Sequence, residues 1–508
     1  MPRFTLPASL ILTLASAVTA QTLTLDKSGG GIPGNLQVRV EGPAGALYAV
    51  VFALSEQSTP VPAPFNITMD IPLDFLDDSL NVPGFSGNIG GSGVVTATVP
   101  LSNDLGFLTS MTVSMQAAGY DNVIWFTSNL VRVTPKFGGT FAPALNQPAL
   151  PIAGGGVAPA ADKQLLFVGG SGPAAQRYKS RTEEWEAAGT TFGVGNLSQT
   201  TGLPDGRVLF TGGLDLVTGQ PTNAAAVYDP VTQTTTTLAM GIARAGHGAS
   251  VMGNGRVLIS GGFEVGDFSN PLALFSGLRN SSEIFDPATN TFTPGPNMLE
   301  ARAMHTSTTL TNGQVLVAGG LSLIPIVNIP TVSATAYKFN PTTNSFGLPS
   351  AFQGGRFFHS AVALSNGKVL LCGGVNLDLT TFLTTLNFAD IVVSTRTDCQ
   401  VYTASPFGFG TFATVNGMQE GRAGAALAQI PGGGALIAGG FQLALDIPNS
   451  QFVFNPTASA DVYALNNTIT GTGPMAAPRL FPTAVNLPDN TILVVGGGPA
   501  NVEIYQPN

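Results

Sequence analysis

Short apolar runs that close on a Gly-Gly pair recur along the last two-thirds of the chain. Seven runs have this form, and their pairs end at Gly170, Gly213, Gly262, Gly320, Gly374, Gly440 and Gly497. Before the apolar run lies another short strand-like segment, and in four units the two are joined by Asn-Gly or Asp-Gly, as at Asn312-Gly313. This dipeptide between apolar segments is a strong signal for a β-hairpin. The rigid part of each unit is therefore predicted to be a two-stranded hairpin.

Each unit continues with a third strand that ends in Asp-Pro or Asn-Pro, at Pro230, Pro287 and Pro341. A fourth strand follows a turn rich in Thr and Asn, as in ATNTFTPGPNM. Four antiparallel strands per unit of about 40–50 residues are typical of a propeller blade. The pattern predicts an all-β chain in which residues 138–508 form a seven-bladed β-propeller.

An arginine stands seventeen residues before the first Gly of the pair in five units. These residues are Arg244, Arg302, Arg356, Arg422 and Arg479. The same offset gives Gly195 in the second unit and Ile152 in the first. In three units a histidine follows three residues after the arginine. The spacing never changes, although successive Gly-Gly pairs lie 43 to 66 residues apart.

The Arg-x-x-His before the first strand, the Gly-Gly after the second and the Asp-Pro after the third resemble the Kelch-repeat and galactose-oxidase-like propeller superfamily. The resemblance covers about residues 138–508 and implies the fold. The copper-radical oxidases of that superfamily need two histidines, two tyrosines and a cysteine, whereas no Tyr-His pair occurs here and all three histidines occupy one repeat position. The resemblance is therefore interpreted as one of fold, and copper-radical oxidase activity is not expected.

The seventh unit stops at Asn508 after three strands. Residues 139–143, Gly-Thr-Phe-Ala-Pro, look like the fourth-strand segment at 290–294. Since proteins avoid exposed strand edges, we expect the segment near 138–148 to pair with the C-terminal strand and complete the seventh blade.

Ahead of the propeller, residues 1–20 have the charge at Arg3, the apolar core and the small residues before Gln21 of a cleavable signal peptide. A membrane anchor is the alternative. Residues 21–135 alternate short β-rich runs with Gly, Pro and Asn turns, which indicates an accessory β-sandwich, immunoglobulin-like in character. The protein is expected to be secreted or to lie in the cell envelope.

Composition narrows the choice of partners. Charged residues make up only 10% of the chain, the net charge is −9, and no Lys/Arg cluster is present. Nucleic acid is therefore not expected as a partner, and no membrane insertion is expected after signal cleavage.

Cysteine and histidine are both scarce. Cys372 and Cys399 fall on adjacent strands of the fifth blade, so a disulfide is expected, with two buried thiols as the alternative. His247, His305 and His359 occupy one repeat position, which favours hydrogen bonding between blades over a metal site.

The five arginines are the candidate ligand-binding residues. They would form a ring on the loop face and bind an acidic ligand through paired N–H donors. The alternative is that each pairs with backbone carbonyls or with a carboxylate of a neighbouring blade. The insertions at 263–280, 321–334, 375–398 and 441–459 emerge on the same face and are unusually apolar for loops.

The chain contains no nucleophile elbow, phosphate loop or clustered metal-ligand spacing. The sequence accordingly predicts no catalytic residue, no metal and no cofactor, and the protein is interpreted as a binding module for an extracellular protein or glycan, not an enzyme. Two alternatives stay open: an extracellular carbohydrate-active enzyme with a site in the propeller funnel, and a structural component of an envelope or surface layer.

Overall fold

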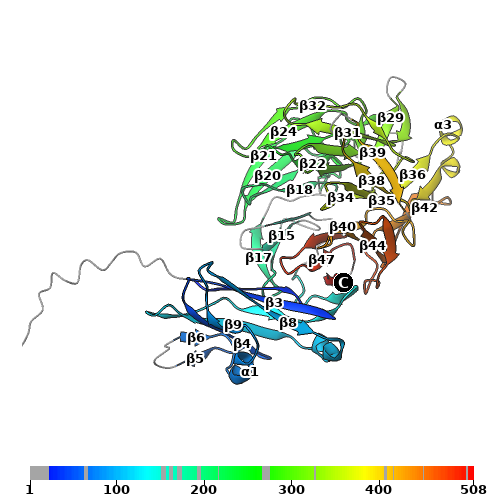
Figure 1. The fold of residues 1–508 in the computed structure, drawn as a ribbon. Coiled ribbons are helices and arrows are strands. Elements are labelled where there is room, and N and C mark those ends of the chain that lie inside the picture. Colours follow the sequence, from blue (N-terminus) through cyan, green and yellow to red (C-terminus); the bar gives the residue numbers. More distant parts are fainter. Residues whose placement is uncertain are drawn as a thin grey trace, which may run out of the picture. The chain divides into compact units, whose positions relative to one another are not determined.

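The computed structural model describes residues 22–61, 67–149, 156–159, 164–168, 174–190, 196–215, 217–265, 275–324, 328–405, 409–415, 417–449, 451–498 and 502–508. The expected signal peptide at 1–20 lies outside these residues, as do Ile152, Gly170 and Gly195. The chain divides into two compact units, Met1–Phe137 and Gly138–Asn508 (Figure 1). Within the described part of the chain, no helix combines the length and the apolar character needed to cross a membrane.

The first unit contains two antiparallel sheets that share one hydrophobic core. One sheet consists of β1 (Thr24–Gly29), β3 (Gly34–Glu41) and β8 (Val94–Leu101); the other of β10 (Trp125–Thr127), β9 (Val113–Tyr120), β4 (Leu47–Ala53) and β7 (Ser86–Asn88), with β11 (Val131–Val133) on β9. Leu36, Val38 and Val40 of β3 are buried and Gln37 between them is exposed. This alternation places one face of the strand against the core, as expected for a sandwich.

Shorter elements complete the first unit. They are β2 (Gly31–Ile32), which pairs in parallel with β12 (Lys136–Phe137), the pair β5 (Thr59–Val61) and β6 (Ile67–Met69), helix α1 (Leu76–Leu80) and the 3-10 helix η2 (Asn103–Ser110).

The second unit contains the seven predicted antiparallel blades, six with four strands and the fourth with a fifth short strand. In chain order the first four are β14 (Gly156–Pro159), β15 (Gln164–Val168), β16 (Ala174–Lys179), β17 (Glu184–Thr190); β18 (Gln199–Gly202), β19 (Val208–Thr211), β20 (Ala224–Asp229), β21 (Thr234–Ala239); β22 (Gly248–Val251), β23 (Val257–Ser260), β24 (Ser282–Asp286), β25 (Thr291–Pro294); and β27 (Thr306–Thr309), β28 (Val315–Ala318), β31 (Thr335–Asn340), β32 (Ser345–Phe346) with β33 (Ser350–Ala351) on β31. The others are β34 (Ser360–Ala363), β35 (Val369–Cys372), β38 (Cys399–Thr403), β39 (Thr411–Val415); β40 (Ala426–Gln429), β41 (Ala435–Ala438), β44 (Ala460–Ala464), β45 (Thr468–Gly471); and β46 (Thr483–Asn486), β47 (Ile492–Val495), β48 (Glu503–Gln506), β13 (Thr140–Pro143).

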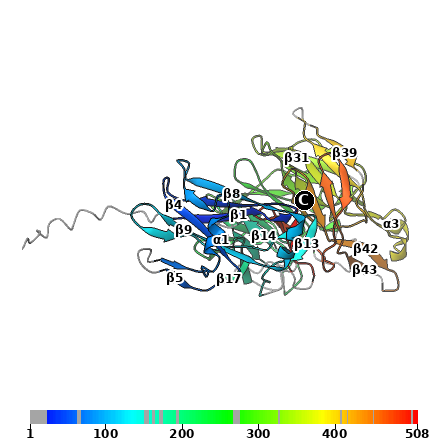
Figure 2. The same cartoon turned by 60° about the horizontal axis from the view of Figure 1, so that its bottom comes forward.

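The seventh blade draws its strands from both ends of the unit. β13 pairs with β48 in the register Thr140 to Gln506 and Pro143 to Glu503, and Figure 2 shows β13 close to the C-terminal end of the chain. The predicted pairing of the segment near 138–148 with the C-terminal strand is therefore present. The first strands of successive blades contact one another, from β14 through β18, β22, β27, β34 and β40 to β46, which again contacts β14.

The Gly-Gly pairs have a geometric cause. Gly261 and Gly262 have φ of 62° and 95°, a region that glycine adopts without strain. A Cβ on Gly261 would lie 2.3 Å from the carbonyl oxygen of Arg302, and the Gly262 N–H donates to the same carbonyl at 2.8 Å. The pair thus ends the second strand of one blade where the backbone of the next blade passes closest.

The described parts of the apolar insertions contain regular secondary structure, where the sequence predicts loops. They include the hairpins β29 (Leu321–Ile324) with β30 (Ile329–Val332), β36 (Val375–Asp378) with β37 (Val392–Thr395), and β42 (Phe441–Asp446) with β43 (Gln451–Pro456); β26 (Arg302–Ala303) pairs with β29, and α3 (Phe382–Thr385) and the 3-10 helix η3 (Phe388–Asp390) lie between β36 and β37. Their apolar residues join one hydrophobic cluster that spans blades three to six. β37 contacts β42.

Candidate functional site

The five repeated arginines lie inside the blades. Each side chain is at most 1% exposed. Each forms an ion pair with one carboxylate: Arg244 with Glu283 at 3.0 Å, Arg302 with Glu300 at 2.8 Å, Arg356 with Asp398 at 2.7 Å, Arg422 with Asp461 at 2.7 Å, and Arg479 with Glu503 at 2.9 Å. In four of the five pairs the carboxylate comes from the start of the third strand of the arginine's own blade, or from the residue before it.

In four of the five units, the glycine seventeen residues after the arginine accepts a hydrogen bond from the arginine side chain. Nη1 of Arg244 donates to the carbonyl of Gly261 at 2.7 Å, and Nη1 of Arg302 donates to that of Gly319 at 2.9 Å. Arg356 and Arg479 make the same bond to the first Gly of their own units. Because the arginine backbone carbonyl also accepts from the Gly-Gly pair of the preceding blade, this position fastens both its own blade and its neighbour.

These contacts match the structural alternative for the arginines, except that four of the five carboxylates come from the arginine's own blade. The expected ring of guanidinium groups is not presented to solvent. Burial lowers the pKa of Arg422 and raises the pKa of its partner Asp461, which shows how strongly this interior disfavours charge. Binding of an acidic ligand by the five arginines stays a prediction, and their burial argues against it.

The three histidines join neighbouring blades. Nε2 of His247 is hydrogen-bonded to Thr211 at 2.9 Å, that of His305 to Ser260 at 3.1 Å, and that of His359 to Thr306 at 2.9 Å. Burial, reinforced by the adjacent arginine, lowers the pKa of His247 and of His359 to about 3. The imidazoles are therefore neutral at ordinary pH.

A ring of residues that the sequence analysis did not identify lies two positions after the arginine or its equivalent. We call it the collar; its members are Leu197, Gly246, Met304, Phe358, Gly424 and Phe481. All six have positive φ, between 49° and 61°. Their backbones are linked across blades: each of the N–H groups of Gly246, Met304, Phe358 and Gly424 donates to the preceding collar carbonyl, at 2.7 to 3.1 Å.

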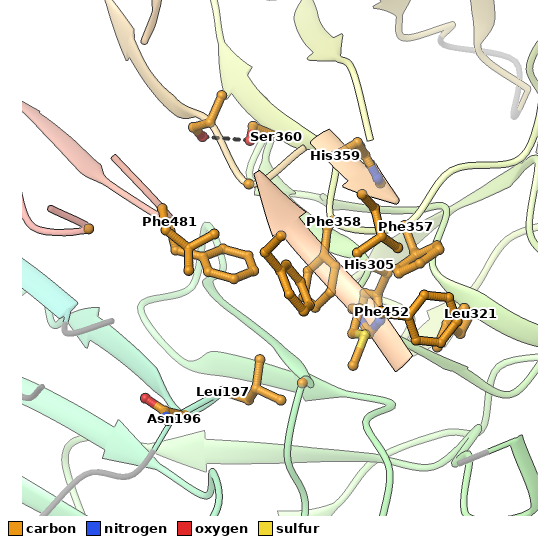
Figure 3. A pocket seen from close by; sticks show the side chains of 18 of the residues that line it. Asn196, Leu197, His305, Leu321, Phe357, Phe358, His359, Ser360, Phe452 and Phe481 are labelled. Carbon is orange, nitrogen blue, oxygen red and sulfur yellow. Dashed lines mark hydrogen bonds between the residues drawn. The ribbon is translucent and has the colours of Figure 1, made fainter. Parts of the chain in front are cut away.

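The collar lines a cavity of about 1310 Å³ at the insertion side of the first strands (Figure 3). We call this cavity the funnel. Its wall also includes Leu377, Leu443 and Phe452 from the insertions, and the polar side chains of Asn196, Ser198, Gln199, Ser360 and Thr483. No Asp, Glu, Lys or Arg is among the described residues that line it.

Aromatic rings gather in the funnel. Between ring centroids, Phe358 lies 5.1 Å from Phe481, and Phe481 lies 6.5 Å from Phe454. The fully buried Phe441, which is not part of the wall, lies 4.8 Å from Phe481. Phe358 and Phe481 are partly exposed, and Phe454 is 41% exposed. The large cavity, its aromatic wall and its neutral polar groups make the funnel the best-formed candidate site.

Cys372 and Cys399 form the expected disulfide. They are directly opposite each other on β35 and β38, so the bond ties the two ends of the insertion that carries β36, α3 and β37. Leu377, Leu379 and Ile391 of this insertion line the funnel. The disulfide therefore supports one wall of the candidate site.

Comparison with known proteins gives the fold and little more. No family model matches the chain, and no curated protein matches it. Solved structures of 525 chains do match. One is a fungal alcohol oxidase of the AA5 family in complex with copper, which is 19% identical, with a TM-score of 0.53 over 73% of this chain and 76% of that one. Another is YjhT, 17% identical, with a TM-score of 0.48 over 65% of this chain and 99% of that one.

The likeness to the oxidase supports the resemblance of fold to galactose-oxidase-like propellers, whereas no family model identifies the repeats as Kelch. It also corrects one expectation. The interpretation that this chain is not an enzyme is contradicted, because a structural neighbour with the same fold is an oxidase.

The described residues do not fit a copper ion. Cys372 is held in the disulfide, each histidine Nε2 is already bonded to a hydroxyl group, and within the described ranges no three His, Cys, Asp or Glu side chains gather as a metal site. The copper of the oxidase is therefore not carried over, and no reaction step is derived through it.

Proposed function

We propose that this protein takes a neutral saccharide into the funnel of its propeller, where the carbohydrate-active alternative places its site. The observation that carries the proposal is the wall of the funnel: aromatic rings with neutral hydrogen-bonding side chains around them and no charged side chain among its described residues. A sugar ring has an apolar face that packs on aromatic carbon and hydroxyl groups that pair with amides and hydroxyls.

The proposal replaces an acidic ligand by an uncharged one. A carboxylate or sulfate would lose its hydration in the funnel without meeting an accessible cation, which costs several kcal/mol. A neutral sugar loses less, because Asn196, Ser360 and Thr483 offer hydrogen bonds at the wall. As part of the same proposal, the signal-peptide pattern of residues 1–20 supports an activity outside the cytosol.

The test compares neutral oligosaccharides with sulfated and uronic acid oligosaccharides by calorimetric titration of the full chain, at about 50 mM and about 500 mM salt. We expect binding of neutral sugars with an affinity that salt leaves unchanged. Product analysis of the same mixtures, for new reducing ends or aldehydes, shows whether bound sugar is converted.

Leu443→Asp provides the site-directed arm. Leu443 is a partly buried funnel residue on β42, and a carboxylate there should weaken binding of a neutral sugar at least about tenfold. Leu348→Asp is the matched control, since Leu348 is 70% exposed and does not line the funnel. Binding restricted to sulfated sugars, strongly weakened by salt, would refute the proposal and support the arginine hypothesis.

A further inference from the structure

The collar keeps bulky apolar side chains in a backbone conformation that such residues rarely adopt. Leu197, Met304, Phe358 and Phe481 have φ of 61°, 55°, 51° and 49°. Among the described residues, the only other apolar non-glycine residue with positive φ is Leu386. Most of the remaining non-glycine cases are asparagines in turns, which tolerate this conformation.

Glycine would satisfy the collar backbone without strain, as Gly246 and Gly424 show at the same repeat position. These two glycines also make room for their neighbours. A Cβ on Gly424 would lie 2.5 Å from Cδ1 of Phe481, and one on Gly246 would lie 3.4 Å from Cγ of Met304. At these two positions the collar has no side chain, and the large side chain of the following collar member lies in the space that a Cβ would fill.

The two collar phenylalanines face the cavity. Figure 3 shows Phe358 and Phe481 next to each other within the funnel, with ring centroids 5.1 Å apart. Both are partly exposed although they pack against the hydrophobic cluster formed by the insertions. Strained conformations that persist around a cavity are typical of functional sites.

We propose that Phe358 and Phe481 are the specificity-determining residues of the funnel, and that they contact the nonpolar ring face of an uncharged ligand. The inference rests on the proposed function in one respect, namely that the funnel is the site. The inference adds that these two residues select the ligand, and that they do so by flat apolar contact. Leu197 and Met304 belong to the same ring of backbone hydrogen bonds and extend the apolar surface.

The experiment titrates the full chain with N-phenyl-1-naphthylamine, a neutral aromatic dye that fluoresces when it enters an apolar site. Phe358→Gly and Phe481→Gly should each weaken dye binding at least about tenfold. Their Tm should stay within about 5 °C of the wild type, because glycine suits the collar backbone. Leu386→Gly is the matched control: Leu386 has φ of 56°, is 66% exposed and lies outside the funnel wall, so this variant should bind like the wild type.

Three results would overturn the proposal: no dye binding by the wild type, glycine variants that bind like the wild type, or Leu386→Gly as damaging as the collar variants. If the glycine variants fail to fold, Phe481→Leu decides, because it keeps an apolar side chain and removes the flat ring. Weakening of at least about threefold supports the proposal, and unchanged binding overturns it.

The two proposals can fail separately. Phe481-dependent dye binding without binding of any neutral sugar would support the collar and refute the saccharide. Sugar binding that Leu443→Asp abolishes but both glycine variants retain would support the saccharide and refute the collar.

Discussion

The buried pair of Arg422 and Asp461 gives the sharpest test of how the repeated arginines act. Both side chains are fully buried, Nη2 of Arg422 lies 2.7 Å from Oδ2 of Asp461, and Nη1 of Arg422 donates to the carbonyl of Ser459. Asp461→Asn removes the ion-pair partner and leaves the buried guanidinium with neutral hydrogen-bond partners and only the longer-range charge of Glu420. Breaking a buried pair in this way costs about 3–5 kcal/mol.

The expected Tm shift follows from the size of the unit. At about 2.1 cal/mol/K per residue, the unfolding entropy of the roughly 370-residue second unit is about 0.8 kcal/mol/K, so this loss lowers its Tm by about 4–6 °C. Differential scanning calorimetry of the full chain measures the shift. The double variant Arg422→Met with Asp461→Leu should recover most of it, because both desolvation costs disappear together.

Asp286→Asn is the matched control. Asp286 pairs with Arg256 at 2.9 Å, but Arg256 is 53% exposed, so the loss should stay below about 1 kcal/mol. If Asp461→Asn proved as mild as Asp286→Asn, the burial argument would be refuted and a solvent-accessible arginine ring would again be the better explanation.

Two further predictions concern stability. His247 and His359 have a pKa of about 3 in the folded protein against about 6.5 when unfolded; the unfolded state therefore binds more protons below pH 6.5, and stability falls as pH drops from about 6.5 toward 3. At pH 5 each histidine lowers the free energy of unfolding by about 2 kcal/mol. Urea titrations at pH 7 and pH 5 measure this difference. A double variant with both histidines replaced by Gln should lose most of the pH dependence, and an undiminished dependence would contradict the prediction. Cys372 and Cys399 are 27 residues apart. Replacing both by Ala should lower the free energy of unfolding by about 3–4 kcal/mol and speed proteolysis within residues 375–398. An unchanged Tm would count against this prediction.

The sequence by itself determined the parts of the molecule that depend on local chemistry. Each repeat contains a strand, a turn and a second strand within about twenty residues. The Asn-Gly or Asp-Gly turn, the Gly-Gly pair and the fixed arginine offset mark these elements directly in the sequence. Their period therefore revealed seven blades and even the β13–β48 pairing, since Gly139 to Pro143 repeats the local pattern of a fourth strand. The disulfide was predictable for the same reason, because Cys372 and Cys399 could be assigned to adjacent strands of one blade.

Only the tertiary structure decided where the repeated side chains end up. The residues next to Arg244 in the sequence do not show whether its side chain faces solvent or pairs with Glu283, which is 39 residues away. The answer depends on where the third strand of the blade places its carboxylate. The collar was missed for a related reason: Leu197 and Phe481 are ordinary apolar residues in the sequence, and only the ring places their side chains around one cavity. Fold followed from periodicity, whereas the site follows from long-range burial, which periodicity does not encode.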